Sequence, residues 1–229
     1  MSIAIIALTA ACLAGCLLAI GKGGQGSALN FRVAWGVALV LFVLNAWMAK
    51  ALPFGNMRHV LCFFPLVMVP AAAYLRRAKR LDLTAWFAAA SAVALAGALM
   101  MPMQAAWRQM PALQSPWFAP HVTSYVIAYG MMSVAGLLAL RSFFGEDGDG
   151  RLSKADVVAR LAFPFMTFGL WSGALWADAA WGRYWAWDIK EVWSLLTWSV
   201  YIICFHVPWS NCGAGYCCWG LRAWWSRFW

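Results

Sequence analysis

"VLCFFPLVMVPAAAYLRRAKR", residues 60–80, is a long apolar run that ends abruptly in a cluster of positive charges. A helix of about 20 residues crosses the roughly 30 Å of hydrocarbon in a bilayer, and residues 60–75 approach that length without any charge. Lys and Arg collect on the cytoplasmic side of membrane proteins. We therefore interpret this stretch as a membrane-spanning helix whose cationic end, residues 76–80, lies in the cytoplasm.

Similar runs recur along the whole chain, which predicts an all-α, polytopic membrane protein. Of the 229 residues, 64% are hydrophobic and only 11% are charged, whereas soluble domains have about 45–50% and 25%. About seven transmembrane helices leave only short loops, so we expect a single transmembrane domain over residues 1–229. The runs lie at about Ile3–Ile20, Val33–Ala49, Val60–Leu75, Leu83–Met101, Val122–Phe143, Val157–Ala177 and Val192–Val207.

The distribution of positive charge predicts the orientation. If the N-terminus is outside and the C-terminus is cytoplasmic, twelve of the 17 Lys and Arg residues face the cytoplasm and five face outwards. This satisfies the positive-inside rule and predicts a multi-pass protein of the bacterial inner membrane. The net charge of +9 would point to nucleic acid in a soluble protein, but here the charges flank spans, so no nucleic-acid partner is expected.

The start of the chain allows two interpretations. "LAGC" at 13–16 resembles a lipoprotein cleavage site with Cys16 as the lipidated residue. No Lys or Arg precedes the apolar run, as a signal peptide requires, so we favour an uncleaved first helix. The seven cysteines form no CxxC pair, and those in apolar surroundings are expected to pack as small apolar residues.

A histidine is predicted at the outer mouth of one span. In "LQSPWFAPHVTSYVIAY", residues 113–129, Pro116 and Pro120 break helicity just before His121. Tyr125 and Tyr129 follow on the helix that begins there. Taken alone, His121 is either an interfacial side chain or a ligand to a metal centre.

The predicted outer-face loop before the last span lies on the same side and is unusually rich in tryptophan. Within residues 176–198 lies "WGRYWAWDIKEVW", residues 181–193. If this segment is helical, Trp181, Trp185 and Asp188 share one face, and Trp187 begins a second stripe with Glu191, Ser194 and Trp198. An interfacial aromatic belt explains two or three Trp residues, but not this density beside charged groups.

Aromatic planes near a histidine fit a flat, apolar ligand with a metal centre. A tetrapyrrole has faces that stack on indole rings and an iron that takes axial His ligands. Its propionates would pair with Arg183 and Lys190, although both side chains could equally be cations that reach from the interface to water.

The segment resembles the "WWD" signature of the cytochrome c assembly family, the haem-handling membrane proteins of the CcsA/CcmC type. The family pattern is approximately W-G-x-x-W-x-W-D-x-K-E-x-W, and Lys190 and Glu191 after the Asp are typical of the CcsA branch. Residues 113–129 are similar to the family segment that carries the first outer axial histidine, which corresponds to His121. The resemblance covers roughly residues 50–207, and the matching signature residues are Trp181, Gly182, Trp185, Trp187, Asp188, Lys190, Glu191 and Trp193.

The resemblance implies a role in cytochrome c biogenesis. Such proteins receive haem b from the cytoplasmic side and present it on the WWD segment at the outer face, with two outer histidines on the iron. The CcsA branch, with a CcsB-like partner, joins haem vinyl groups to the CxxCH thiols of apocytochrome c, so the protein would be part of a holocytochrome c synthase, or haem lyase. Positioning would dominate this chemistry, so no catalytic side chain is expected.

Two further histidines are candidate iron or haem ligands. His206 in "YIICFHVP" resembles the family's intramembrane histidine, which pairs with a histidine of the partner subunit. It lies 18 residues beyond Asp188, roughly 27 Å along a helix, and so cannot share an iron with His121.

The second outer histidine of the family has no counterpart at its usual place. The family adds another span after the WWD helix, with that histidine on the connecting loop, whereas this chain continues in "SNCGAGYCCWGLRAWWSRFW". His59, in "PFGNMRH", would either supply that ligand or lie beside the haem as an interfacial residue.

Two other functions remain open from the sequence. A polytopic transporter would need ionisable residues at the bilayer midplane or paired broken helices, and the midspan helix breaker of note is Pro164. A regulatory membrane subunit of tetrapyrrole synthesis would share the architecture but would not need His121.

Overall fold

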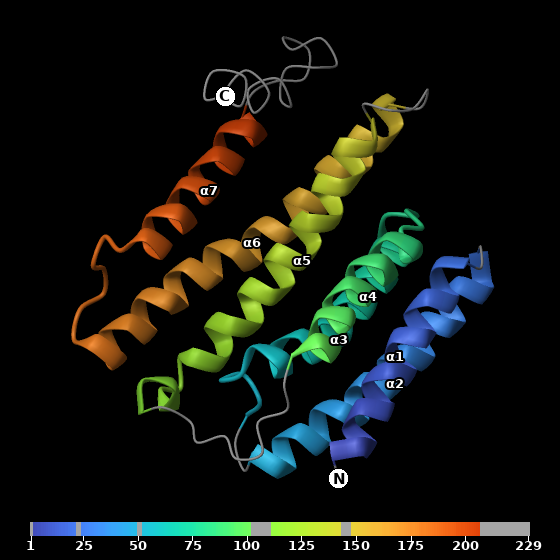
Figure 1. Cartoon of the computed structure of the whole chain (residues 1–229). Helices are drawn as coiled ribbons and strands as arrows, with labels where there is room; N and C mark the ends of the chain where they lie inside the picture. The colour runs from blue at the N-terminus through green and yellow to red at the C-terminus, as the bar shows by residue number, and fades with distance from the viewer. Residues whose placement is uncertain (1, 22–23, 50–51, 102–110, 143–147, 207–229) are drawn as a thin grey trace.

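The protein is an all-α helical bundle, as predicted. The computed structural model describes residues 2–21, 24–49, 52–101, 111–142 and 148–206, and these contain no strand. The helices, shown in Figure 1, are α1 (Ser2–Gly21), α2 (Gly24–Ala49), α3 (Met57–Ala78), α4 (Thr84–Met100), the short 3-10 helix η1 (Pro111–Gln114), α5 (Phe118–Ser142), α6 (Gly148–Trp181) and α7 (Ile189–His206).

The chain is a multi-pass membrane protein. Of the described helices, α1, α2, α3, α5 and α6 are long and apolar enough to cross a bilayer, and α4 is a shorter apolar helix of 17 residues. Each of the seven predicted spans coincides with one helix, although the last predicted residue, Val207, lies outside the described residues. α5 begins at Phe118, earlier than expected, because Pro120 sits in its first turn, where an N–H group has no partner within the helix.

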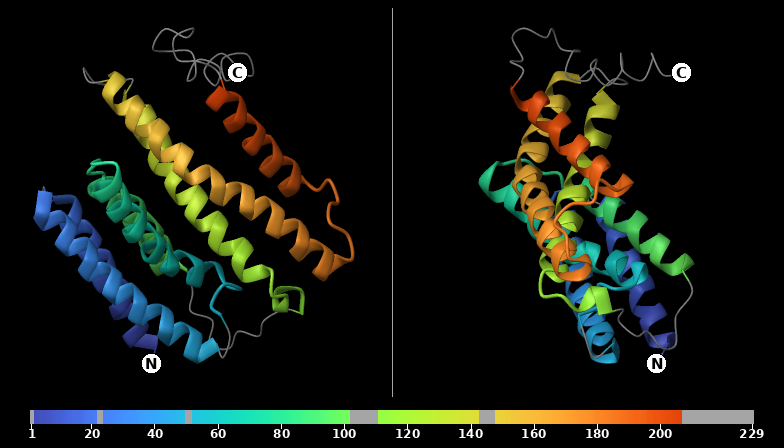
Figure 2. Two further views of the ribbon diagram at one scale, coloured as in Figure 1. Left: turned by 180° about the vertical axis from the view of Figure 1, so that it is seen from behind. Right: turned by 90° about the vertical axis from the view of Figure 1, so that its left-hand side faces the viewer.

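Successive helices run in alternate directions as packed pairs. α1 with α2, α3 with α4, and α5 with α6 lie side by side, and α7 occupies the outer flank beside α6 (Figure 2). The start of α1, η1 and the α6–α7 connection lie at one end of the bundle, which we call the platform end (Figure 1). The turn at residues 79–83 and the C-terminal end of α7 lie at the opposite end, which we call the cationic end.

Small polar groups join the apolar helices. The buried thiol of Cys12 donates a hydrogen bond to the Ala34 carbonyl oxygen at 3.2 Å, and the Ser27 hydroxyl donates to the Ala19 carbonyl oxygen at 2.7 Å. These hydrogen bonds link α1 to α2 in a defined direction, which apolar contacts alone do not provide. Cys12, Cys16 and Cys62 are free and buried, which confirms that they pack as small apolar residues.

A proline within α3 frees a backbone carbonyl oxygen that links this helix to α2. Pro65 and Pro70 lie inside this helix, and neither interrupts its helical assignment. Pro70 has no N–H to donate to the Leu66 carbonyl four residues earlier. The Trp35 indole N–H of α2 donates to that carbonyl oxygen instead, at 3.1 Å. Pro164 is likewise accommodated within a continuous α6, so a break at this position does not occur.

Candidate functional site

A pocket at the platform end brings the two predicted segments together. Its volume is about 470 Å³, within the range of roughly 300–1,000 Å³ that ligand sites occupy. It lies between α5, α6 and the residues that connect α6 to α7. The predicted residues that line it are His121, Trp181, Arg183, Trp185, Asp188, Lys190 and Glu191.

The imidazole of His121 is held in one orientation. Its Nδ1 lies 2.9 Å from the carbonyl oxygen of Gly169 on α6. A carbonyl oxygen can only accept, so Nδ1 carries the proton and donates this bond. The lone pair is therefore on Nε2. Metal-binding histidines commonly have this arrangement, in which the second ring nitrogen donates to a carbonyl group.

Two glycines of α6 create the space that this side chain occupies. A Cβ atom added at Gly173 would lie 2.6 Å from Cε1 of His121, and one added at Gly169 would lie 3.1 Å from the ring of Tyr125. The two glycines are four residues apart, as are His121 and Tyr125. The two pairs face each other across the α5–α6 contact, which is the close approach that a G-x-x-x-G spacing permits.

Aromatic rings surround the histidine. Trp176 stacks on the imidazole with ring centroids 5.8 Å apart and an angle of 10° between the planes, while Tyr125 meets it edge-on at 4.9 Å. The Trp176 indole N–H donates to the Ala112 carbonyl oxygen of η1 at 2.8 Å, which ties η1 to α6. Trp181 contacts Trp176 edge-on at the end of the same helix.

The α6–α7 connection is not helical, in agreement with a loop between the spans expected at Val157–Ala177 and Val192–Val207, and the helical arrangement considered for its tryptophans does not form. Trp181, Trp185 and Asp188 do not share a helical face, because α6 ends at Trp181 and α7 begins at Ile189. Gly182 has a φ of +72°, and Trp187 also adopts the left-handed conformation, with a φ of +59°. For a bulky side chain this conformation is rare and costs about 1–2 kcal/mol. The second predicted stripe likewise loses Trp187.

Asp188 and Glu191 stabilise this turn by a reciprocal cap. The Asp188 carboxylate accepts a hydrogen bond from the Glu191 N–H at 2.8 Å. The Glu191 carboxylate in turn accepts from the N–H groups of Ala186 at 2.7 Å and Asp188 at 3.4 Å. This is the capping-box arrangement at the start of a helix. The two acidic residues of the signature therefore determine the path of the backbone that carries the tryptophans.

The tryptophans and cations of the connection are accessible. Trp181, Trp187 and Trp193 expose 63%, 71% and 57% of their surface. Trp185 is more enclosed, and its ring meets that of Trp187 edge-on at 5.9 Å. Arg183 and Lys190 are exposed and line the pocket.

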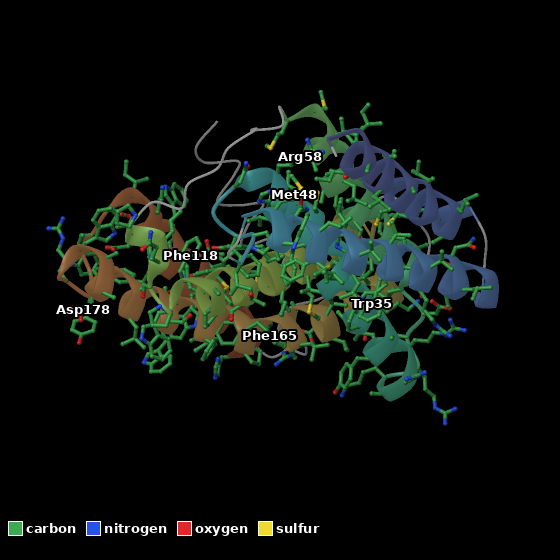
Figure 3. The ribbon with its side chains drawn as sticks, turned by 90° about the horizontal axis from the view of Figure 1, so that it is seen from below. Trp35, Met48, Arg58, Phe118, Phe165 and Asp178 are labelled. Atoms are coloured by element: carbon green, nitrogen blue, oxygen red, sulfur yellow. The ribbon has the colours of Figure 1, made fainter. Side chains whose placement is uncertain are left out.

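The structure separates the three histidines. His206 lies in the last turn of α7 at the cationic end, where its Nδ1 is 2.8 Å from the Ile202 carbonyl oxygen, so it is remote from His121 as the spacing predicted (Figure 1). His59 lies in the first turn of α3 and does not line the pocket. In Figure 3, its neighbour Arg58 lies near α1 and α2, whereas Phe118 and Asp178 mark the other side of the platform end.

Residues that sequence reasoning missed complete the pocket. Gly169, Gly173 and Trp176 were not predicted as site residues, yet each contacts or bounds the position of His121. The signal for the glycines was present in "GLWSG", residues 169–173, a small-x-x-x-small spacing typical of closely packed membrane helices. The continuation "SNCGAGYCCWGLRAWWSRFW" lies outside the described residues.

A comparison with known families decides the membership of this chain. The family described as cytochrome C assembly protein matches residues 2–215, which include the whole pocket. The chain belongs to this cytochrome c assembly protein family. The match also includes α1 and α2, which lie outside the range of about 50–207 that the signature motifs indicated.

Curated relatives of this cytochrome c assembly protein carry the name cytochrome c biogenesis protein CcsA. The relative from Chlamydomonas reinhardtii is 42% identical over 116 residues, which are 45% of this chain and 33% of that protein. The relative from Prochlorococcus marinus (strain MIT 9303) is 28% identical, with 92% of this chain and 83% of that protein covered. The relative from Welwitschia mirabilis is 26% identical, with 72% and 70% covered. These similarities confirm the CcsA branch.

Proposed function

We propose that this protein binds haem b in the pocket at the platform end and presents it to apocytochrome c. Its family membership supports a role in cytochrome c biogenesis. The orientation of His121 is the observation that carries the haem proposal. The bond from Nδ1 to Gly169 fixes the tautomer and leaves the lone pair on Nε2, so His121 would hold the haem iron through this nitrogen.

The walls of the pocket suit a tetrapyrrole. Trp176, Trp181 and Trp185 offer flat apolar surfaces on which a macrocycle can stack. Arg183 and Lys190 lie on the same lining and would pair with its propionates. The exposed faces of Trp187 and Trp193 would then contact the apoprotein or the ligand edge.

In this proposal, the chain contributes positioning and no covalent chemistry of its own. Haem supplies the vinyl groups, to which the two thiols of an apocytochrome c CxxCH motif add. The cap formed by Asp188 and Glu191 orients the tryptophan surface, while His121 orients the iron. The protein would act as part of a holocytochrome c synthase in the bacterial inner membrane, with a CcsB-like partner. His206 would pair with a histidine of that partner, and α7, which has no buried residue, leaves a flank open for it.

An absorption spectrum of the detergent-purified chain tests the haem proposal. We expect a Soret band and sharp α and β bands on reduction in the wild type. His121→Ala should abolish or broaden the reduced bands, because the axial nitrogen is lost. Thr123→Ala is the matched control, since Thr123 lies on the same helix outside the pocket lining and should leave the spectrum unchanged.

Two results would contradict parts of this proposal. A colourless wild type after haem is supplied, or an unchanged spectrum in His121→Ala, would exclude His121 as the ligand of a bound haem. His59→Ala tests separately the second-ligand role expected for His59 from the sequence, although His59 does not line the pocket. If that variant keeps the wild-type spectrum while His121→Ala loses it, His59 does not bind the iron.

A further inference from the structure

A second cavity lies at the cationic end, remote from the haem pocket. Its volume is about 320 Å³, and it is lined by residues of α2, α3 and the start of α4. Three arginines, Arg32, Arg76 and Arg77, contribute to its surface. An adjoining hollow of about 420 Å³ shares Arg32 and Arg76 with it. The two hollows therefore share two arginine residues in their linings.

The positive charge in this cavity is only partly compensated. Among the described residues that line either hollow, none is acidic. The nearest carboxylate is that of Asp82, whose Oδ2 lies 3.8 Å from Nε of Arg76. Its other oxygen accepts hydrogen bonds from the Thr84 N–H and hydroxyl, at 3.2 Å and 2.7 Å, at the start of α4. Nη1 of Arg76 is buried and has no hydrogen-bond partner among the described residues.

A buried guanidinium N–H without an acceptor is unfavourable and is normally satisfied by an anion or water. Guanidinium groups bind the oxygen atoms of phosphates particularly well, because their planar N–H groups can donate in pairs. Arg32 on α2 and Arg76 on α3 come from different helices, so an anion between them would join the two helices. A phosphate group matches the donors that this cavity presents.

Apart from the three arginines and Thr84 at the start of α4, the lining of the cavity is apolar. It consists of Ala28 and Phe31 of α2 and Val69, Ala72 and Ala73 of α3. Both helices are long and apolar enough to span a bilayer, so these residues lead from the cationic end towards the hydrocarbon region. A ligand with an anionic head and an apolar tail fits such a surface better than a free anion does. Basic pockets between membrane helices are known to accept lipid headgroups.

We propose that the cavity between α2, α3 and α4 binds the phosphate headgroup of an anionic phospholipid through Arg32 and Arg76. The acyl chains lie against the apolar residues of α2 and α3. The site fixes the α2–α3 contact at the end of the bundle opposite the haem pocket. It is independent of haem binding, because none of its residues lines the pocket at the platform end.

Native mass spectrometry of the full chain, titrated with phosphatidylglycerol or phosphatidylcholine, tests the proposal. We expect the wild type to prefer phosphatidylglycerol. The double variant Arg32→Gln with Arg76→Gln should lower the affinity for phosphatidylglycerol about tenfold or more and leave phosphatidylcholine binding unchanged. The matched control is Lys79→Gln with Arg80→Gln, which removes the same charge from the adjacent turn but does not touch the cavity lining.

Equal losses in the two double variants would show general surface attraction and overturn the proposal. Displacement of the lipid by millimolar inorganic phosphate alone would identify a site for free phosphate. If the variant Arg32→Gln with Arg76→Gln lost the haem spectrum but kept its lipid binding, the two arginines would be assigned to the haem carboxylates. Thermal unfolding of each variant detects misfolding. If the double variant does not fold, Arg32→Gln alone is the substitute, since Arg32 lines the cavity but is exposed, and unchanged lipid affinity in that variant would contradict the site.

Discussion

At Gly173, the absence of a Cβ atom leaves the space that the imidazole of His121 fills. The neighbouring Gly169 contributes through its carbonyl oxygen, which accepts the Nδ1 proton. One turn of α6 thus sets both the place and the tautomer of the proposed ligand. A helix with larger residues at these two positions would separate α5 from α6 and would rotate the imidazole away from the pocket.

The variant Gly173→Ala tests this arrangement. The added Cβ would lie 2.6 Å from Cε1 and 2.7 Å from Nδ1 of His121, closer than real Cβ contacts permit, so the ring must move. We expect haem affinity to fall and the reduced α band to broaden, although the helix itself gains propensity. Absorption spectra and thermal unfolding measure the two effects separately.

Gly136→Ala on α5 is the control for that variant. A Cβ at Gly136 meets nothing within 4 Å, so the haem spectrum should not change. If Gly173→Ala also leaves the spectrum intact, the contact between α5 and α6 does not position the ligand.

At the scale of elements, the start of α7 determines how the tryptophans are displayed. The reciprocal bonds of Asp188 and Glu191 stabilise the first turn of this helix and the left-handed residue Trp187 just before it. The rest of α7 contacts α6 through the Trp198 indole N–H, which donates to Thr167 Oγ1 at 3.0 Å, and through the rings of Trp198 and Phe205, which contact Phe163. The cap therefore sets the local path of the backbone over residues 186–191, while these contacts hold α7 against α6.

Replacement of Glu191 by Ala should release the connection. The N–H groups of Ala186 and Asp188 lose their acceptor, and loss of such a cap typically costs about 0.5–2 kcal/mol. We expect a lower thermal midpoint, changed near-ultraviolet dichroism of the tryptophans and weaker haem binding. Glu191→Gln keeps one carbonyl oxygen as an acceptor and should retain most of the wild-type signal. Equal effects of both substitutions would assign the role to the charge instead of the cap.

At the scale of the molecule, the two ends of the bundle carry two sites of different chemical character. The aromatic pocket with His121 is lined by α5, α6 and the α6–α7 connection, and the arginine-lined cavity by α2, α3 and the start of α4. The α6–α7 connection and the turn between α3 and α4 lie at opposite ends of the bundle (Figures 1 and 2). Because successive helices run in alternate directions, successive connections along the chain lie at opposite ends of the bundle, and the two sites are separated in the same way. If the cationic end faces the cytoplasm, as the charge distribution predicts, the pocket opens on the outer side.

Labelling of single cysteines tests this orientation. In a variant without native cysteines, Ser115→Cys next to η1 should react with an impermeant maleimide in intact cells. Lys79→Cys, in the turn after α3, should react only after the membrane is permeabilised. The reverse pattern would show that the pocket faces the cytoplasm and would contradict haem presentation at the outer face.

The sequence by itself determined the helical membrane fold. Each helix must satisfy its own backbone hydrogen bonds in lipid, so apolar length alone located each of the helices α1 to α7 in the described part of the chain. The motifs around His121 and Trp181 identified the family. The positions of Gly169 and Gly173 were readable as a small-x-x-x-small spacing, but their partners on α5 were not. Only the tertiary structure decided which side chains fill that space.

Tertiary structure also decided the form of the α6–α7 connection. The predicted spans implied a loop here, but the spacing of the tryptophans did not describe the path of its backbone, because spacing reports side-chain types and not the hydrogen bonds between them. The left-handed Trp187 and the cap of Asp188 and Glu191 depend on backbone groups that sequence periodicity does not describe. In the same way, Arg32 and Arg76 are 44 positions apart in the chain, and only the packing of α2 against α3 brings them to one cavity.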